Sequence, residues 1–288
     1  MLDIIDVDFD WLKRFFKYNP LYLLCSFIYL TLGALSLGGG AFGWFFSTVL
    51  YAVSLALVFS PVGERLLRII ENIRPLYTKR EKDYLLPIFE EVYYKAKETY
   101  PKLRLELCVI DQMHVQACAL GLHTIAVTKG AMETFSEDEL KAVIGHEIGH
   151  VVNMDTTASL FFYVGHGYYS IYILLSRFFV NLFMKIIYST QNGILKAAAS
   201  LARYLYEFSL FGFTLIINIF IALNSRNNEH RADYYTYSLG FGQEMIEALY
   251  LLEKINLSSN HSIITKMIAR HPIIPLRIAH LEYLYENN

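Results

Sequence analysis

Two apolar stretches near the start of the chain constrain its fold more than any other feature. Leu21–Leu37 and Phe42–Ser60 hold 17 and 19 residues without a charged side chain, and the glycine-rich segment GGGAFG lies at their junction. A helix of about 20 apolar residues spans a hydrocarbon core of about 30 Å. The two stretches therefore predict a hairpin of two transmembrane helices.

The composition of the whole chain agrees with a membrane protein. The sequence is 55% hydrophobic and 15% aromatic but only 18% charged, which lies well off the average for soluble domains. A net charge of −2 without a basic stripe argues against nucleic acid as a partner. The cysteines are three in number and lack zinc-finger spacing, so we expect small buried thiols at Cys25, Cys108 and Cys118.

Basic residues flank the predicted hairpin, and its turn carries no charge. The positive-inside rule therefore predicts that both ends of the hairpin are cytoplasmic. Lys185, Lys196 and Arg203, between two later apolar runs, weaken the rule there, so the prediction rests on the hairpin. The flanking residues are Lys13, Arg14 and Lys17 before it, and Arg65, Arg68, Arg74, Lys79, Arg80 and Lys82 after it.

Residues 62–155 have the pattern of a folded polar domain. An amphipathic helix is predicted up to Pro75 and a second from about Glu81 to Lys97, followed by short strands at 103–110, 115–120 and 124–128. Ser136 and Glu139 form an S-x-x-E capping box that predicts the start of another helix. The order helix, small sheet, helix indicates an α+β domain.

The chain becomes apolar again after this domain. Residues 158–176 and 208–223 predict a second pair of membrane helices, which gives about four spans in a mainly α-helical protein. The segment from residue 225 onward is polar with a helical pattern.

The motif VIGHEIGHVVNMD, residues 143–155, carries the chemistry of this chain. On a helix, His146 and His150 lie one turn apart on one face, so both imidazoles can bind one metal ion, and Glu147 can reach a water on that ion. The alternative is three polar residues on a solvated helix face. Histidine and carboxylate ligands suit peptide hydrolysis better than thiolates, because they leave the ion a stronger Lewis acid.

A catalytic zinc ion needs a third protein ligand, and NSRNNEHRADYY (224–235) offers Glu229. Asp233 follows four residues later, so a helix places both carboxylates on one face. One can bind zinc while the other accepts the N–H of a ligand histidine. The alternative for this segment alone is an ordinary polar helix next to the membrane.

These residues resemble a known family. AVIGHEIGHVVNMD, followed by SRNNEHRAD and preceded by a two-helix hairpin, is similar to the integral-membrane zinc peptidases of the HtpX kind, which are related to the CAAX prenyl proteases. SEDELKAVIGHE and HPIIPLRI resemble further elements of that family. The resemblance covers roughly residues 20 to 285, and the family's usual N-A-F appears here as Gln116, Ala117 and Cys118.

The resemblance implies a zinc metalloendopeptidase of gluzincin type in the bacterial inner membrane, with its active site on the cytoplasmic side and proteins or peptides as substrates. It assigns zinc to His146, His150 and Glu229, catalysis to Glu147, and the E-x-x-x-D aspartate to Asp233. It implies the following division: 1–61, N-terminal arm and membrane hairpin; 62–155, catalytic domain; 156–224, second membrane pair; 225–288, C-terminal part of the catalytic domain.

Two further assignments are predictions, and two alternative functions stay open. His271 and Arg277 are candidates for stabilising the oxyanion, against a His-Pro turn that starts a helix. Gln116, Ala117 and Cys118 are candidates for an edge strand that pairs with an extended substrate. The alternative functions are a non-enzymatic membrane scaffold with a structural zinc ion, and a protease for prenylated peptides.

Overall fold

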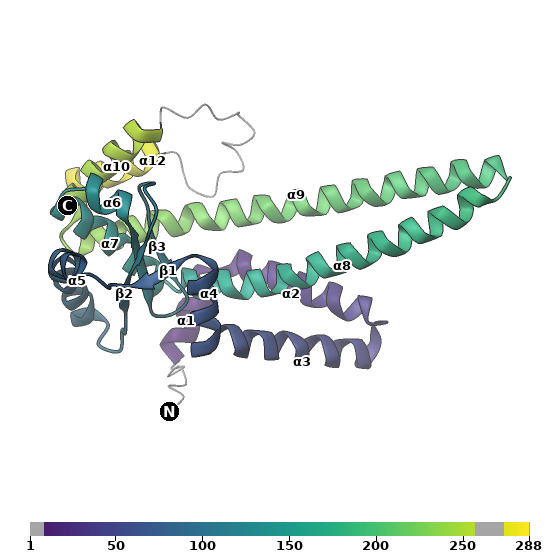
Figure 1. Cartoon of the computed structure of the whole chain (residues 1–288), viewed down its shortest axis with the longest axis horizontal. Helices are drawn as coiled ribbons and strands as arrows, with labels where there is room; N and C mark the ends of the chain where they lie inside the picture. The colour runs from purple at the N-terminus through teal and green to yellow at the C-terminus, as the bar shows by residue number, and fades with distance from the viewer. Residues whose placement is uncertain (1–8, 257–273, 288) are drawn as a thin grey trace. The chain divides into compact units, whose positions relative to one another are not determined.

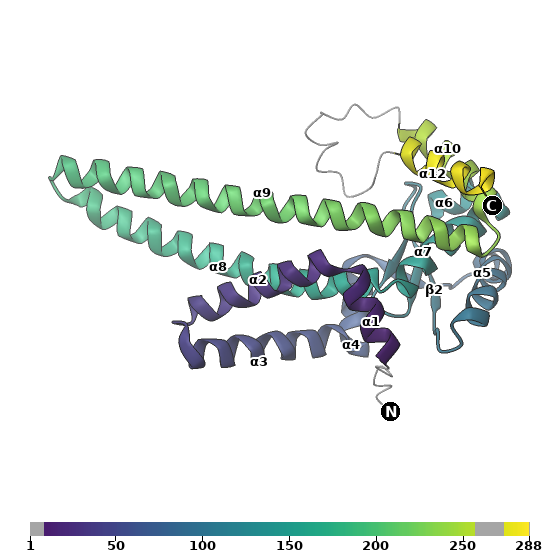
Figure 2. The same cartoon turned by 180° about the vertical axis from the view of Figure 1, so that it is seen from behind.

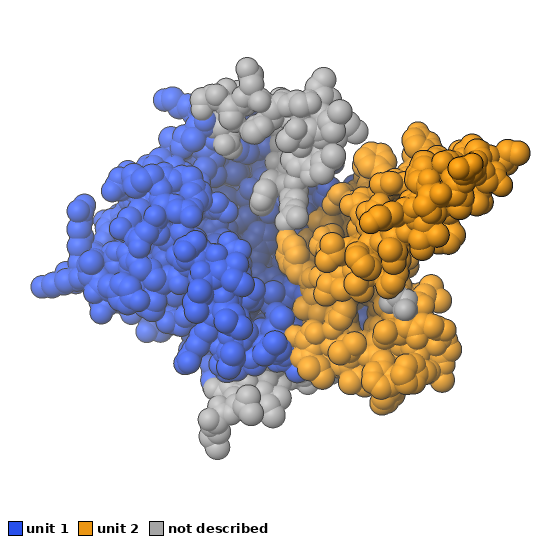
Figure 3. All heavy atoms as spheres, turned by 45° about the vertical axis from the view of Figure 1, so that its right-hand side comes forward, with its two compact units in different colours: residues 1–20, 56–160, 222–288 blue, residues 21–55, 161–221 orange. Residues whose placement is uncertain are grey.

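The computed structural model describes residues 9–256 and 274–287, and these residues divide into two compact units. Unit 1 comprises residues 1–20, 56–160 and 222–288, and unit 2 comprises 21–55 and 161–221, blue and orange in Figure 3. The helices and strands of the described residues are α1 (Phe9–Tyr18), α2 (Pro20–Ser36), α3 (Gly40–Val58), α4 (Pro61–Ile70), β1 (Ile73–Pro75), α5 (Lys79–Thr99), β2 (Glu106–Ile110), β3 (Ala117–Leu120), β4 (Thr124–Thr128), α6 (Lys129–Thr134), α7 (Glu137–Val152), α8 (Asp155–Ser189), α9 (Gly193–Ser238), α10 (Gly242–Asn256) and α12 (Ile274–Glu286) (Figure 1).

The predicted fold class is confirmed, because the described residues are mainly helical and contain one small sheet. Helices α3, α8 and α9 are long and apolar enough to cross a membrane, and Pro20–Leu35 is a shorter apolar helix. The predicted hairpin is thus seen as α2 and α3, joined through Gly38, Gly39 and Gly40, all of which have positive φ. Glycine adopts this conformation without a steric cost.

Unit 2 packs the first hairpin against α8 through aromatic and hydroxyl groups. Tyr29 is only 1% exposed, and its hydroxyl lies 3.0 Å from Nδ1 of His166. A Cβ atom at Gly165 would lie 2.8 Å from the Tyr29 ring, so only glycine allows this approach. The Tyr51 hydroxyl donates to the carbonyl of Phe161 at 2.7 Å. These contacts fix α2 and α3 against the part of α8 near residues 161–169.

Helices α8 and α9 are longer than the sequence pattern predicted. The expected spans at 158–176 and 208–223 lie inside helices of 35 and 46 residues. The apolar runs mark only the segments without charge, and both helices continue past Arg177 and Glu207, since arginine and glutamate are good helix formers. These two side chains form an ion pair between α8 and α9 at 2.7 Å.

The sheet of unit 1 has the order β1-β2-β4-β3, with β2 and β4 parallel and the other pairs antiparallel. The expectation of a helix up to Pro75 was wrong, because α4 ends at Ile70 and residues 73–75 form β1. Asn72 between them has φ of 55°, a left-handed conformation that asparagine tolerates better than most residues. The chain therefore turns and buries Ile73 in the sheet.

The core of unit 1 lies between the sheet and helices α5, α7, α10 and α12 (Figures 1 and 2). Helix α7 contributes Leu140, Ile144 and Ile148, each with no exposed surface. Its start confirms the predicted capping box, since the Ser136 hydroxyl accepts from Glu139 N and the Glu139 carboxylate accepts from Ser136 N. This apolar face holds α7 rigidly and leaves its opposite side for the motif residues.

Candidate metal centre

The close approach of α7 and α9 creates the site. A Cβ atom at Gly149 would lie 3.1 Å from the Cα of Ala232, tighter than almost all such contacts in proteins. A side chain at position 149 would push the two helices apart. Glycine therefore allows α9 to bring Glu229 and Asp233 next to the histidines of α7.

Three side chains from these helices converge. Ligand atoms of His146, His150 and Glu229 all lie within 4.8 Å of one another. His146 Nε2 is 3.4 Å from Glu229 Oε2, and His150 Nε2 is 3.6 Å from Glu229 Oε1. Nitrogen and carboxylate donors at such separations can all contact one ion with bonds of about 2.0–2.2 Å.

Each histidine is oriented by a carboxylate on its other ring nitrogen. His146 Nδ1 lies 2.9 Å from Asp233 Oδ1, and His150 Nδ1 lies 2.9 Å from Asp155 Oδ2. A hydrogen bond at Nδ1 leaves the lone pair on Nε2 for a metal ion. The pairing of Asp233 with a motif histidine is the arrangement that the sequence suggested, while the role of Asp155 was missed.

Asp155 reaches His150 because the chain breaks its helix between them. Met154 has φ of 65°, which ends α7 and lets α8 begin at Asp155. Asp155 also accepts from Arg231 Nη2 at 3.0 Å, and Arg231 donates to Asn228 Oδ1 at 2.7 Å. The only signal in the sequence was the acidic residue that ends the motif, and a spacing of five residues does not place two side chains on one face of a continuous helix.

A cluster of buried amides supports this junction from the N-terminal side. Asn19 has no exposed surface, and its amide nitrogen lies 3.4 Å from the carbonyl of Asn153. Oδ1 of Asn19 accepts from Nδ2 of Asn224 at 3.2 Å and from Nδ2 of Asn228 at 3.4 Å. This cluster ties the end of α1 to the α7–α8 junction and to α9.

Arg277 of α12 binds the carboxylates of the site. Its guanidinium donates to both oxygens of Asp233, with Nε 2.8 Å from Oδ2, and Nη1 lies 3.0 Å from Glu229 Oε2. Nη2 is 3.3 and 3.4 Å from the two ring nitrogens of His146, so the guanidinium faces the ring rather than one nitrogen. These contacts position the ligands; a role in oxyanion stabilisation stays a prediction. His271, the other candidate, lies outside the described residues.

The charges of this site fit a divalent cation. With neutral imidazoles, four carboxylates meet two guanidiniums, and this leaves two negative charges uncompensated. Burial lowers the pKa of His150, but hydrogen bonds to Asp155 and Glu229 outweigh it, so the pKa of His150 is raised well above its usual value. The surroundings of His150 therefore stabilise a positive charge, which a bound cation would supply. The four carboxylates are those of Glu147, Asp155, Glu229 and Asp233, and the two guanidiniums are those of Arg231 and Arg277.

Glu147 lies beside the ligands without joining them. Its Oε2 accepts the backbone N–H of Ala119 in β3 at 2.8 Å. Thr128 N donates to the carbonyl of Gln116 at 3.0 Å. The backbone N–H and C=O groups of even-numbered residues of β3 therefore point toward β4, and those of odd-numbered residues point to the outer edge of the sheet. Of the three residues predicted to contact substrate, only Ala117 has its backbone groups at that edge. Its neighbour along the same edge is Ala119, whose N–H binds Glu147.

Comparisons with known proteins place this chain among membrane proteases. The chain is 28% identical over 198 residues to "Protease HtpX homolog" of Desulfotalea psychrophila (62% of this chain, 67% of the relative) and 30% identical over 179 residues to "Protease HtpX" of Pseudomonas syringae pv. tomato (60% and 57%). "Protease HtpX" of Stenotrophomonas maltophilia (strain K279a) is 29% identical over 178 residues, 57% of this chain and 56% of the relative. The matches thus span little more than half of most of these relatives.

A solved structure gives the same fold. Ste24p of S. mikatae aligns with a TM-score of 0.53 over 94% of this chain and 64% of that one. At 18% identity the likeness concerns the fold alone. Residues 79–285 match the sequence profile of Peptidase family M48, and this range includes His146, His150, Glu229 and Arg277. The chain belongs to peptidase family M48.

Proposed function

We propose that this chain is a zinc-dependent membrane endopeptidase that hydrolyses peptide bonds of membrane or misfolded proteins. The observation that carries the proposal is the convergence of His146, His150 and Glu229, with Glu147 beside them and free of the ligand set. Structural zinc sites are usually closed by four protein ligands. Among the residues that the structure describes, three ligands and an adjacent carboxylate instead match a site that keeps a position for water.

The residues around the ion divide the reaction between them. His146, His150 and Glu229 would hold a zinc ion, which would supply Lewis acidity for the attack of water on a peptide carbonyl. Glu147 is placed to act as general base toward the attacking water and to return the proton to the leaving amine. Asp233 and Asp155 bind Nδ1 of His146 and His150 and so leave Nε2 of each ring free to act as a ligand, and Arg277 holds Asp233 and Glu229 in place.

The substrate binds along β3 in this proposal. In the described sheet β3 pairs only with β4, so its other edge can pair with an extended peptide through backbone hydrogen bonds. That edge runs beside Glu147, which bonds to Ala119. A peptide held there brings its carbonyl to the metal centre with little demand on its side chains, which favours loose sequence specificity.

Ala117→Pro tests this strand. The substitution removes one N–H at the outer edge and leaves the bonds between β3 and β4 intact. We expect KM to rise about 2- to 12-fold, the value of one lost hydrogen bond of about 0.5–1.5 kcal/mol, with unchanged zinc content. Steady-state cleavage of a fluorogenic peptide measures it, and Ala117→Val, which keeps the N–H, is the control. Parent-like kinetics for Ala117→Pro would remove β3 from the substrate site.

Metal content and proteolysis together test the proposed function. The full chain, purified in detergent, should carry about one equivalent of zinc and degrade casein. 1,10-Phenanthroline should abolish degradation, and added zinc should restore it. Zinc without any degradation of casein or unfolded membrane proteins would favour the scaffold alternative.

For the location we propose the bacterial inner membrane with the metal centre on the cytoplasmic side. The support is the charge pattern around the first hairpin, with basic residues at both ends and none in its turn. A reporter fused at Gly40 should therefore read periplasmic, and one at Asn288 cytoplasmic. Reporters that read the same side at both positions would contradict this orientation.

A further inference from the structure

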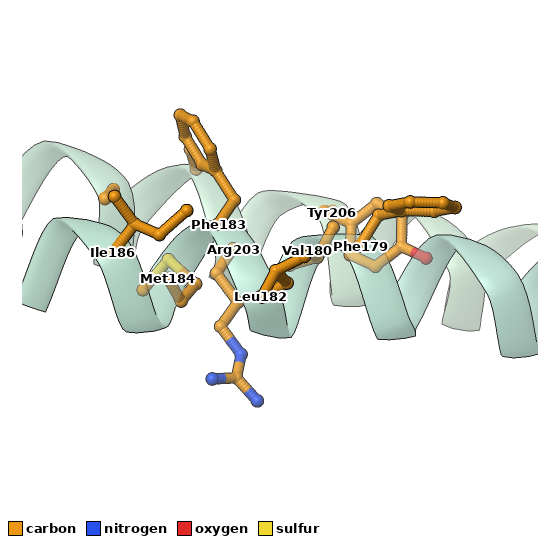
Figure 4. Close-up of a pocket in the computed structure, with 10 residues that line it drawn as sticks. Phe179, Val180, Leu182, Phe183, Met184, Ile186, Arg203 and Tyr206 are labelled. Carbon is orange, nitrogen blue, oxygen red and sulfur yellow. The ribbon is translucent and has the colours of Figure 1, made fainter.

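The far part of unit 2 contains an apolar groove that the proposed chemistry does not use. It lies between α8 and α9 and has a volume of about 530 Å³. Its lining includes Phe179, Phe183, Met184, Ile186 and Ala199, and one charged residue, Arg203 (Figure 4). We call it the distal groove. In Figure 4 the side chain of Arg203 extends away from the two helices, so its guanidinium is accessible at the edge of the groove.

The charge around the distal groove has one sign. Residues 178–206 contain Lys185, Lys196 and Arg203 and no aspartate or glutamate. Arg177 and Glu207, which directly flank this segment, form an ion pair with each other. Among the described residues no carboxylate lies within ion-pair distance of the three other cations. The groove therefore presents uncompensated positive charge beside an apolar surface.

The length of the helices places this groove near a membrane surface. Within unit 2, α8 extends from Phe161 to Ser189, which is about 42 Å at 1.5 Å per residue. The hydrocarbon core is about 30 Å thick, and about 40–45 Å with its headgroup layers. The first hairpin, by contrast, has helices of 17 and 19 residues and contacts α8 near residues 161–169. Counted from Phe161, a core of about 30 Å ends near residue 181, so the part of α8 beyond that point, which includes Phe183, Met184 and Ile186, reaches the level of the headgroups.

The side chains exposed there have the composition of a lipid interface. Phe179 is 60% exposed, Phe183 63% and Tyr204 69%. Aromatic residues combined with lysine and arginine are typical of segments that contact acyl chains and headgroups at once. In the proposed orientation this end of α8 and α9 faces away from the cytoplasm, where the positive-inside rule disfavours lysine and arginine. The presence of Lys185, Lys196 and Arg203 there therefore needs a reason other than topology.

We propose that the distal groove binds an anionic phospholipid, with an acyl chain along Phe179, Phe183 and Met184 and the phosphate against Arg203. The apolar lining suits a hydrocarbon chain, and the planar guanidinium can donate two parallel hydrogen bonds to a phosphate. The excess of cations selects a lipid with net negative charge over a zwitterionic one. This inference rests on membrane insertion and on the proposed orientation, and it is independent of peptidase activity.

Native mass spectrometry of the full chain, purified and delipidated in detergent, tests this site. Dioleoyl phosphatidylglycerol should bind at least about fivefold more tightly than dioleoyl phosphatidylcholine, since each basic residue near a lipid surface contributes about 1 kcal/mol. Arg203→Gln should remove that preference, and Arg203→Lys should keep most of it. Arg80→Gln makes the same charge change on the exposed start of α5 and should leave the preference intact. Ala199→Phe should fill the groove and weaken both lipids.

Three outcomes would overturn the proposal. Equal affinity of the parent for the two lipids would show that the groove does not select charge. Retention of the preference in Arg203→Gln would place the anionic lipid elsewhere. Dimers of the parent that exclude lipid and disappear in Ala199→Phe would assign the groove to a second copy of the chain. Far-ultraviolet circular dichroism of each variant ensures that a loss of binding is not a loss of helix.

Discussion

Glu147→Gln is expected to keep about one equivalent of zinc and to lose cleavage activity by a factor of about 10²–10⁴, the usual contribution of a general acid–base group. Glu147 lies outside the three-ligand group, so its loss removes no bond to the metal. A glutamine oxygen can still accept the N–H of Ala119, which preserves the contact between α7 and β3. Only the ability to take and return a proton is lost.

The measurement pairs zinc content with single-turnover cleavage of the same preparation. Glu133→Gln, a neutralised carboxylate on α6 outside the site, serves as the control and should behave like the parent. Loss of zinc from Glu147→Gln would contradict the assignment, because it would place Glu147 among the ligands. Retained activity would move the general base to another residue.

The parts of this site that could be predicted are those fixed by short-range rules. His146, Glu147 and His150 share a helix turn, and the capping box at Ser136 and Glu139 sets where that helix begins. Glu229 and Asp233 repeat the same spacing on α9. Helical geometry alone therefore brings each group of side chains together, and the family resemblance pairs the two groups.

The parts that could not be predicted depend on tertiary contacts. Asp155 reaches His150 only because Met154 adopts a left-handed conformation, and no residue type in that segment demands such a break. Asn19 is 134 residues from Asn153, and no local pattern relates them. Arg277 resembled a catalytic donor in the sequence, but its place is decided by packing of α12 beside Asp233.

The early end of α4 and the length of α8 and α9 have different origins. Local propensity allows a helix through residue 75, yet burial of Ile73 in the sheet, by contacts distant in sequence, is more favourable. The apolar runs of α8 and α9 show only where charge is absent, and arginine and glutamate are good helix formers, so both helices continue past Arg177 and Glu207.

Glu229→Ala should lose both zinc and activity. We expect zinc affinity to fall by more than a factor of about 100, because the loss of a residue that only supports a metal ligand typically costs about 10–100-fold. Glu229 is 3% exposed and supplies the only carboxylate of the three-ligand group, so water would have to replace it within a buried site. The fold should survive, because Arg277 retains both of its bonds to Asp233. Zinc content, measured across a range of free zinc concentrations, gives the loss in affinity.

Asp233→Asn is the matched variant, since it changes the neighbouring carboxylate on the same face of α9. Asp233 contacts His146 rather than the ion position, so we expect zinc affinity to fall only about 10–100-fold and activity to return at higher zinc concentrations. The order of the two variants decides the assignment. If Asp233→Asn loses zinc completely while Glu229→Ala binds it and still cleaves, then Asp233 is the third ligand, and Glu229 acts through Arg277 instead.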